Sequence, residues 1–280
     1  MAKIGRRNIL TVLRLATPGA YLDGRDRGEI LMPGRYVPKG TVAGEAFDVF
    51  VYRDSEDRLV ATPEKAKAMV GDFEALRVVS ADPRIGAFLD WGLSKDLFLP
   101  LREQSRRVQA GEWVVVYVFV DLKTDRVVAT TRLNRHLNVT PAAYEEGQPV
   151  DLLVYSRTDL GYGAIIAGAH TGLLYHNELP EPLRIGQKLV AYVKALRADG
   201  KIDLSLHPSG FRRVAPLKEQ IMEALVAGGG RVPLGDESTP EAIRAAFGSS
   251  KKAFKQAIGS LYRERLIVIE GSTIRLPDTV

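Results

Sequence analysis

The chain has 280 residues, of which 45% are hydrophobic and 26% are charged, a balance that is ordinary for a folded protein of several small domains. It contains no cysteine, which excludes a disulfide framework and a catalytic thiolate. The first residues lack a long apolar segment, and no later run approaches membrane-spanning length. We therefore expect a cytoplasmic protein with no membrane partner.

The net charge of +5 is unevenly distributed along the chain. Residues 1–70 carry 12 Lys and Arg against 9 Asp and Glu, residues 211–280 carry 11 against 8, and residues 143–210 carry 6 against 8. Attraction for phosphate groups is therefore expected mainly from the two ends of the chain. A basic excess of this size is also common on proteins that bind no polyanion.

Two copies of one pattern fill the first half of the chain, and a third copy follows. Residues 20–23 match 87–90, residues 29–33 match 96–100, and, after one inserted residue, 58–62 match 126–130. The third copy comprises residues 161–166, 172–179 and 199–206, with an apolar run at 185–193 before its last segment. The order of the segments is the same in each copy, so we expect the same fold three times.

Each copy predicts a closed barrel of five short strands, because apolar or alternating runs are broken by turn residues. In the second copy the expected strands are residues 73–80, 86–90, 96–100, 113–120 and 127–131. A glycine in each second strand, Gly19, Gly86 and Gly163, is typical of a sharply bent strand. Closure into a barrel removes exposed sheet edges.

After residue 208 the hydrophobic period becomes helical. Leu217, Ile221 and Leu225 predict one helix, Thr239 and a proline open a second, and a third begins at residue 249 or 250. Residues 266–276 predict a hairpin that turns at 270–272. Three helices and a hairpin indicate a winged helix. We therefore expect a mostly β protein with domains at residues 1–66, 67–142, 143–209 and 210–280.

The third copy resembles the S1 RNA-binding domain, a five-stranded OB-type barrel, and the other two copies resemble it less closely. The resemblance implies that single-stranded RNA stacks on aromatic side chains of the second and third strands. Tyr21 and Phe88 match the later aromatic position of the family motif, and Tyr162 matches the earlier one. Phe98 and Tyr175 match the third-strand position.

Two interpretations of these aromatic residues remain open. Phe88 and Phe98 suit a buried core as well as an RNA-binding surface. We expect Tyr162 and Tyr175 at the surface, because a phenolic hydroxyl favours contact with water. His176 follows Tyr175 and suits either an RNA contact or a hydrogen bond that stabilises a turn.

Lys251, Lys252 and Lys255 lie in the first turns of the third predicted helix, which is the usual recognition element of a winged helix. Arg263 extends this basic group. These residues predict phosphate contacts, and the alternatives are an ordinary solvated helix face and a protein-binding module.

No catalytic pattern is present in the sequence. The four histidines lack metal-site spacing, and the glycine runs lack the residues that complete a phosphate-binding loop. We therefore expect a protein that is not an enzyme and has neither a metal nor another cofactor.

Three S1-like barrels followed by a winged helix resemble the conserved virulence factor B family, and residues 250–262 are the most family-like stretch. The resemblance implies an RNA-binding protein that regulates gene expression after transcription. Two alternatives remain: a scaffold that binds ribosomal or RNA-processing proteins, and a DNA-binding regulator that acts through the winged helix. The sequence predicts neither the preferred RNA sequence nor the oligomeric state.

Overall fold

A computed structural model describes residues 1–207 and 211–277, with side chains from residue 217 onward in the second range. The predicted boundary at residues 209 and 210 lies outside the described residues. The chain divides into two compact units, Met1–Ala142 with Asp151–Leu189, and Ala143–Val150 with Val190–Val280, and strands of the third barrel belong to both. Strands account for 40% of the chain and helices for 18%, which confirms the mostly β prediction.

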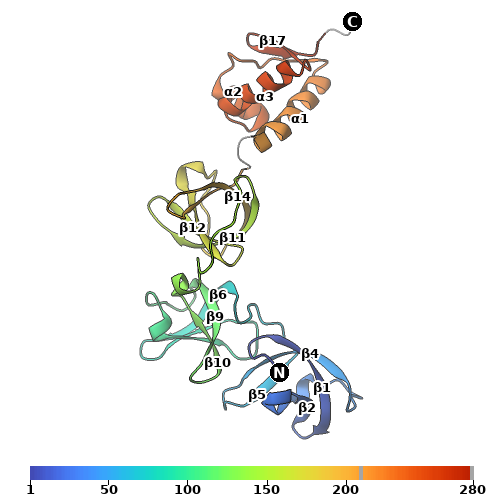
Figure 1. The fold of residues 1–280 in the computed structure, drawn as a ribbon, viewed down its shortest axis with the longest axis vertical. Coiled ribbons are helices and arrows are strands. Elements are labelled where there is room, and N and C mark those ends of the chain that lie inside the picture. The colour runs from blue at the N-terminus through green and yellow to red at the C-terminus, as the bar shows by residue number, and fades with distance from the viewer. Residues whose placement is uncertain (208–210, 278–280) are drawn as a thin grey trace. The chain divides into compact units, whose positions relative to one another are not determined.

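The three predicted barrels are present, each closed and built from five strands (Figure 1). The first contains β1 (Arg7–Ala16), β2 (Gly19–Asp23), β3 (Glu29–Pro33), β4 (Ala46–Arg53) and β5 (Leu59–Thr62). The second contains β6 (Phe73–Asp82), β7 (Gly86–Leu89), β8 (Leu97–Pro100), β9 (Trp113–Asp121) and β10 (Arg126–Thr130). The third contains β11 (Pro149–Arg157), β12 (Gly161–Ile166), β13 (His170–Tyr175), β14 (Lys188–Leu196) and β15 (Ile202–Ser205).

All three barrels have the same strand order, in which the third strand pairs with the fifth and the fifth with the fourth. A β-bulge interrupts the first strand of each barrel at the same point, after Val12, Val78 and Val154. A short 3-10 turn follows the third strand in each case, at Gly34–Tyr36, Leu101–Glu103 and His176–Glu178. The shared irregularities identify equivalent residues across the copies.

The first two barrels share a continuous hydrophobic core. Trp91 of the second barrel is 2% exposed and packs edge-on against Phe50 of the first, with 5.3 Å between ring centroids. Its indole N–H donates a 2.7 Å hydrogen bond to the Ala68 carbonyl. Asp125 joins the same barrels through ion pairs to Arg27 and Arg53. These two barrels are therefore held in a fixed relation by packing and by charge.

The C-terminal part is a winged helix (Figure 1). Its elements are α1 (Phe211–Ala227), β16 (Arg231–Val232), α2 (Pro240–Phe247), α3 (Lys251–Arg263), β17 (Val268–Glu270) and β18 (Thr273–Arg275). Thr239 and Ser250 cap α2 and α3 by accepting backbone N–H bonds, as capping residues do. Ile221, Phe254 and Ile258 lie in its buried core.

Candidate nucleic-acid interface

The bent second strand fixes the register of each barrel. The backbone N–H groups of Gly34, Leu101 and His176 donate to the carbonyls that precede Gly19, Gly86 and Gly161. A side chain at any of these three glycines would collide with the third strand, since an ideal Cβ would lie 2.1, 2.3 or 2.0 Å from a backbone oxygen. The equivalent glycine of the third barrel is therefore Gly161, and the prediction of Gly163 is wrong by two residues.

In the first barrel, Tyr21 and Leu31 are cross-strand neighbours and both are partly exposed. The Arg14 guanidinium lies 3.8 Å from the centre of the Tyr21 ring, in cation–π geometry. Arg14 also holds Glu29 through two hydrogen bonds of 3.1 and 2.6 Å, which lower the pKa of that carboxyl. An aromatic ring and a positioned arginine thus share one surface.

In the second barrel, Phe88 and Phe98 occupy the positions of Tyr21 and Leu31. Their rings lie 5.3 Å apart at 37°, and both side chains are partly exposed rather than buried in the core. A hollow of about 420 Å³ beside Phe98 is also lined by Arg102 and Arg126. These arginines form 3.0 Å ion pairs with Asp121 and Asp57, at side chains that are 62% and 46% exposed.

The third barrel has a different surface. The expectation that Tyr162 lies at the surface is wrong, because its side chain is 2% exposed. Once the register is set by Gly161, Tyr162 is equivalent to Ala20 and Ala87, which face the barrel interior. The positions of Phe88 and Phe98 are held here by Gly163 and Leu173.

Tyr175 and His176 are partly exposed at the end of β13. His176 Nε2 lies 2.8 Å from the Thr158 carbonyl, and its ring packs edge-on against Tyr162 at 5.0 Å. These contacts agree with the alternative in which His176 stabilises a turn. Tyr175 does not occupy the position of Phe98, since it pairs with Gly161.

Sequence patterns gave no signal for Tyr155, which belongs to the bulge of β11. An ideal Cβ at Gly163 would lie 3.1 Å from its Cε1 atom, so the Tyr155 ring lies over the glycine. Leu13 and Val79 occupy the equivalent bulges of the other barrels and are 47% and 50% exposed.

The predicted basic residues of the winged helix lie on α3. Lys252 and Lys255 are exposed and Lys251 is partly buried, while Lys255 forms a 3.0 Å ion pair with Asp236. The Arg263 side chain donates to the Gly259 carbonyl at 3.2 Å, one turn earlier in the helix. The first turns of α3 therefore carry most of the accessible positive charge of this helix.

Two family models match the chain. The S1 domain model matches residues 4–64 and 70–132, and the CvfB-like winged helix domain model matches residues 219–276. The protein is therefore of the class that combines tandem S1 barrels with a C-terminal winged helix, domains that imply nucleic-acid binding.

The chain is 27% identical over 246 residues to conserved virulence factor B of Staphylococcus saprophyticus, covering 83% of this chain and 80% of that protein. It is 24% identical over 240 residues to conserved virulence factor B of Staphylococcus aureus strain USA300, with the same coverage. A crystal structure of a multidomain protein with nucleic acid binding domains from Streptococcus pneumoniae aligns over 98% of both chains, at 23% identity and a TM-score of 0.44. The chain is therefore similar over most of its length to proteins named conserved virulence factor B, and it carries the CvfB-like winged helix domain.

Within residues 1–207 and 211–277, no helix is long and apolar enough to cross a membrane. In the same described ranges, no group of three or more His, Cys, Asp or Glu residues is arranged to hold a metal ion.

Proposed function

We propose that this protein binds single-stranded RNA through the outer faces of its first two barrels and through α3, and regulates gene expression after transcription by binding rather than by catalysis. The observation that supports this most directly is the pair formed by Phe88 and Phe98. Two rings on neighbouring strands that stay partly exposed offer π-faces to bases. Each stacked base contributes about 1–3 kcal/mol without demanding a particular sequence.

The charges around the aromatic residues support the same function. Arg102 and Arg126 beside Phe98, and Arg14 beside Tyr21, are within reach of the backbone of a strand that stacks on these rings. Their carboxylate partners are exposed or partly exposed, so a phosphate can exchange with them at small cost. Phosphate contacts of this kind fix the position of a strand, and the rings bind its bases.

The lysines of α3 are placed against the helix dipole. Cations at a helix N-terminus are disfavoured by the partial positive charge of the free backbone N–H groups. Lys251 and Lys252 therefore reduce helix stability slightly and add to the attraction for an anion at this end of α3. We infer that they contact nucleic-acid phosphates.

The proposed setting is the cytoplasm, where the bound strand would be a transcript. Regulation of transcript stability or translation, together with ribosomal or RNA-processing proteins, is the role that we propose for the complex. It rests on the similarity to conserved virulence factor B proteins and on the two kinds of nucleic-acid-binding domain.

Fluorescence anisotropy tests the proposal with labelled poly-pyrimidine and poly-purine RNA at two salt concentrations. Affinity should fall steeply with salt, because several phosphates release counterions. Phe88→Leu keeps the apolar bulk and removes the π-face, and we expect it to weaken RNA binding by about tenfold. The matched Phe88→Trp variant should retain binding. Equal binding by both variants would contradict stacking at this position.

A second function is favoured by one observation on the winged helix. Val226, Tyr262 and Leu266 are 71%, 55% and 43% exposed, and apolar side chains of this kind suit contact with another protein. Capture of a partner that survives nuclease treatment and is lost in Tyr262→Ala would support the scaffold function. Displacement of RNA by duplex DNA would instead favour the DNA-binding alternative.

A further inference from the structure

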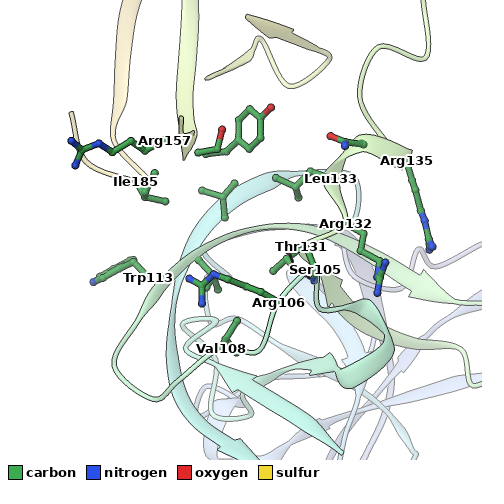
Figure 2. Close-up of a pocket in the computed structure, with 15 residues that line it drawn as sticks. Ser105, Arg106, Val108, Trp113, Thr131, Arg132, Leu133, Arg135, Arg157 and Ile185 are labelled. Carbon is green, nitrogen blue, oxygen red and sulfur yellow. Dashed lines mark hydrogen bonds between the residues drawn. The ribbon is translucent and has the colours of Figure 1, made fainter. Parts of the chain in front are cut away.

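A basic cavity of about 690 Å³ lies between strands of the second and third barrels, within the first compact unit (Figure 2). Four arginines line it and no carboxylate does. The four are Arg106, Arg132, Arg135 and Arg157. The cavity is distinct from the surfaces of Tyr21 and Phe88, and its size is within the usual range for small-molecule sites, about 300–1,000 Å³.

Two of the arginines are not neutralised. Arg132 and Arg157 have no carboxylate within 4.0 Å among the residues that the structure describes. Arg106 lies 2.9 Å from Glu112, whereas Arg135 is 3.9 Å from its nearest carboxylate. The cavity therefore has uncompensated positive charge, which is the condition for binding an anion.

The orientation of Arg132 is fixed by the backbone. Its Nε–H donates to the Arg102 carbonyl at 2.9 Å, which leaves the terminal nitrogens of the guanidinium for a ligand. A held guanidinium loses less side-chain freedom when it binds a phosphate. Figure 2 shows Arg106 and Arg157 on the same side of the cavity as Trp113, with Arg132 and Arg135 on the other.

Trp113 gives the cavity an aromatic wall. Its side chain is 56% exposed at the start of β9, although tryptophan is usually well buried. Tyr155 and Ile185 also line the cavity. An arginine can bind the phosphate of a nucleotide, and an exposed indole can stack on its base.

We propose that this cavity binds a nucleotide unit, with the base stacked on Trp113, its phosphate on Arg157 at the same side, and the adjacent phosphate of a strand on Arg132 at the other side. The ligand chemistry is shared by a free nucleotide and by one residue of a single-stranded RNA. If the ligand is a residue of RNA, the proposal rests on the proposed function and extends it. The cavity would then bind a part of the strand that lies beyond the outer faces of the first two barrels.

The two tryptophans make the site directly observable. Trp91 is 2% exposed and hydrogen-bonded in the shared core, so ligands in the cavity should change only the emission of Trp113. The full chain is titrated with uridine monophosphate, adenosine monophosphate, inorganic phosphate, and oligonucleotides with and without a 5′-phosphate. We expect saturable quenching by nucleotides, none by phosphate, and no response in Trp113→Phe.

Charge variants test the arginines. The double variant Arg132→Gln with Arg157→Gln should lower the affinity for the nucleotide by about tenfold to a hundredfold. This is the usual loss when hydrogen bonds to charged groups are removed. Lys39→Gln with Lys123→Gln removes the same charge from exposed side chains outside the cavity and should change affinity less than about twofold. Equal losses in the two double variants would overturn the proposal, since the effect would then be general electrostatics.

The remaining outcomes separate this site from the proposed function. If oligonucleotides bind by anisotropy but leave Trp113 emission unchanged, the cavity is not a nucleotide site and the barrel faces still bind RNA. If a free mononucleotide quenches Trp113 as strongly as oligonucleotides do, the nucleotide site is supported and its ligand is the free nucleotide. Quenching by inorganic phosphate as strong as by nucleotides would overturn base recognition, and loss of both signals would overturn both proposals.

Discussion

Replacement of Trp91 by alanine tests whether the first two barrels depend on one core. Burial of a tryptophan side chain removes about 200 Å² of its surface from water. At 25 cal/mol/Å² this corresponds to about 5 kcal/mol of hydrophobic stabilisation. Trp→Ala changes in protein cores cost about 3–5 kcal/mol. Because the Trp91 ring contacts Phe50 and Tyr52 of the first barrel, this loss should be shared by both barrels. We expect the free energy of opening to fall by about 4 kcal/mol in each.

Hydrogen exchange of the full chain measures this effect barrel by barrel. Amides of β4 in the first barrel and β6 in the second should exchange about a thousandfold faster in Trp91→Ala, since each 1.4 kcal/mol is tenfold. Trp91→Phe keeps a ring and removes the N–H donor to the Ala68 carbonyl, so it should cost about 1–3 kcal/mol. Trp113→Ala is the matched control, because that side chain is 56% exposed and its loss should stay within about 0.5 kcal/mol.

A change in hydrogen exchange that is confined to the second barrel would contradict this prediction. Faster exchange in β6 with unchanged exchange in β4 would show that the barrels open independently and that the contact between Trp91 and Phe50 carries little energy. RNA affinity gives a second measurement, and it should fall in Trp91→Ala. Binding one strand across two barrels costs more entropy when the barrels move independently than when they are fixed.

Three further predictions each concern one residue. Gly86→Ala should destabilise the second barrel by about 2–4 kcal/mol in denaturant unfolding, because its φ is +141° and a Cβ would lie 2.3 Å from the Leu99 carbonyl. Asp125→Asn should speed exchange in the first two barrels by weakening its two arginine contacts, by about 1 kcal/mol given their partial exposure. Burial lowers the pKa of His136, whose ring stacks on Tyr117 at 3.9 Å, so its contribution to stability is present above its ordinary pKa of about 6.5 and is lost as pH falls through the lowered value. Thermal unfolding from pH 7.5 to 5.0 should show this loss in the wild type and not in His136→Phe.

Much of the fold could be predicted because its signals are local. Strand alternation and the repeated segments identify the barrels, and Thr239 and Ser250 mark the starts of α2 and α3 by chemistry confined to one turn. Gly271, with φ of +57°, lies in the predicted hairpin turn. Each of these features depends on neighbours in the sequence, so a single sequence contains the information.

The register of the third barrel could not be predicted, because it depends on contacts across strands. β12 contains two glycines, Gly161 and Gly163, and both suit a bent strand locally. The approach of the Leu174 carbonyl to Gly161 and the hydrogen bond from the His176 N–H to the Leu160 carbonyl distinguish them, and both contacts cross to the neighbouring strand. A two-residue error keeps the alternation of faces but changes which side chains are equivalent. The surface position expected for Tyr162 rested on its phenolic hydroxyl, and the correct register places the residue in the core with Ala20 and Ala87.

The family resemblance had a similar limit. The third copy carries the motif that is closest to the S1 pattern, yet the residues that the S1 model matches lie in the first two barrels. The cavity with its four arginines was also beyond prediction, since Arg106 and Arg157 come from different copies and meet only after both barrels fold.

The three barrels share one fold but present different side chains on their outer faces, as the residues at equivalent positions of the second and third strands show. The same pair of positions holds Tyr21 and Leu31 in the first barrel and Phe88 and Phe98 in the second. In the third barrel this pair includes Gly163, and the Tyr155 ring from the neighbouring strand lies over it. Since the third barrel presents no second- or third-strand ring at this point, we expect bases to stack on the first two barrels only. The third barrel contributes Arg157 and Tyr155 to the basic cavity instead.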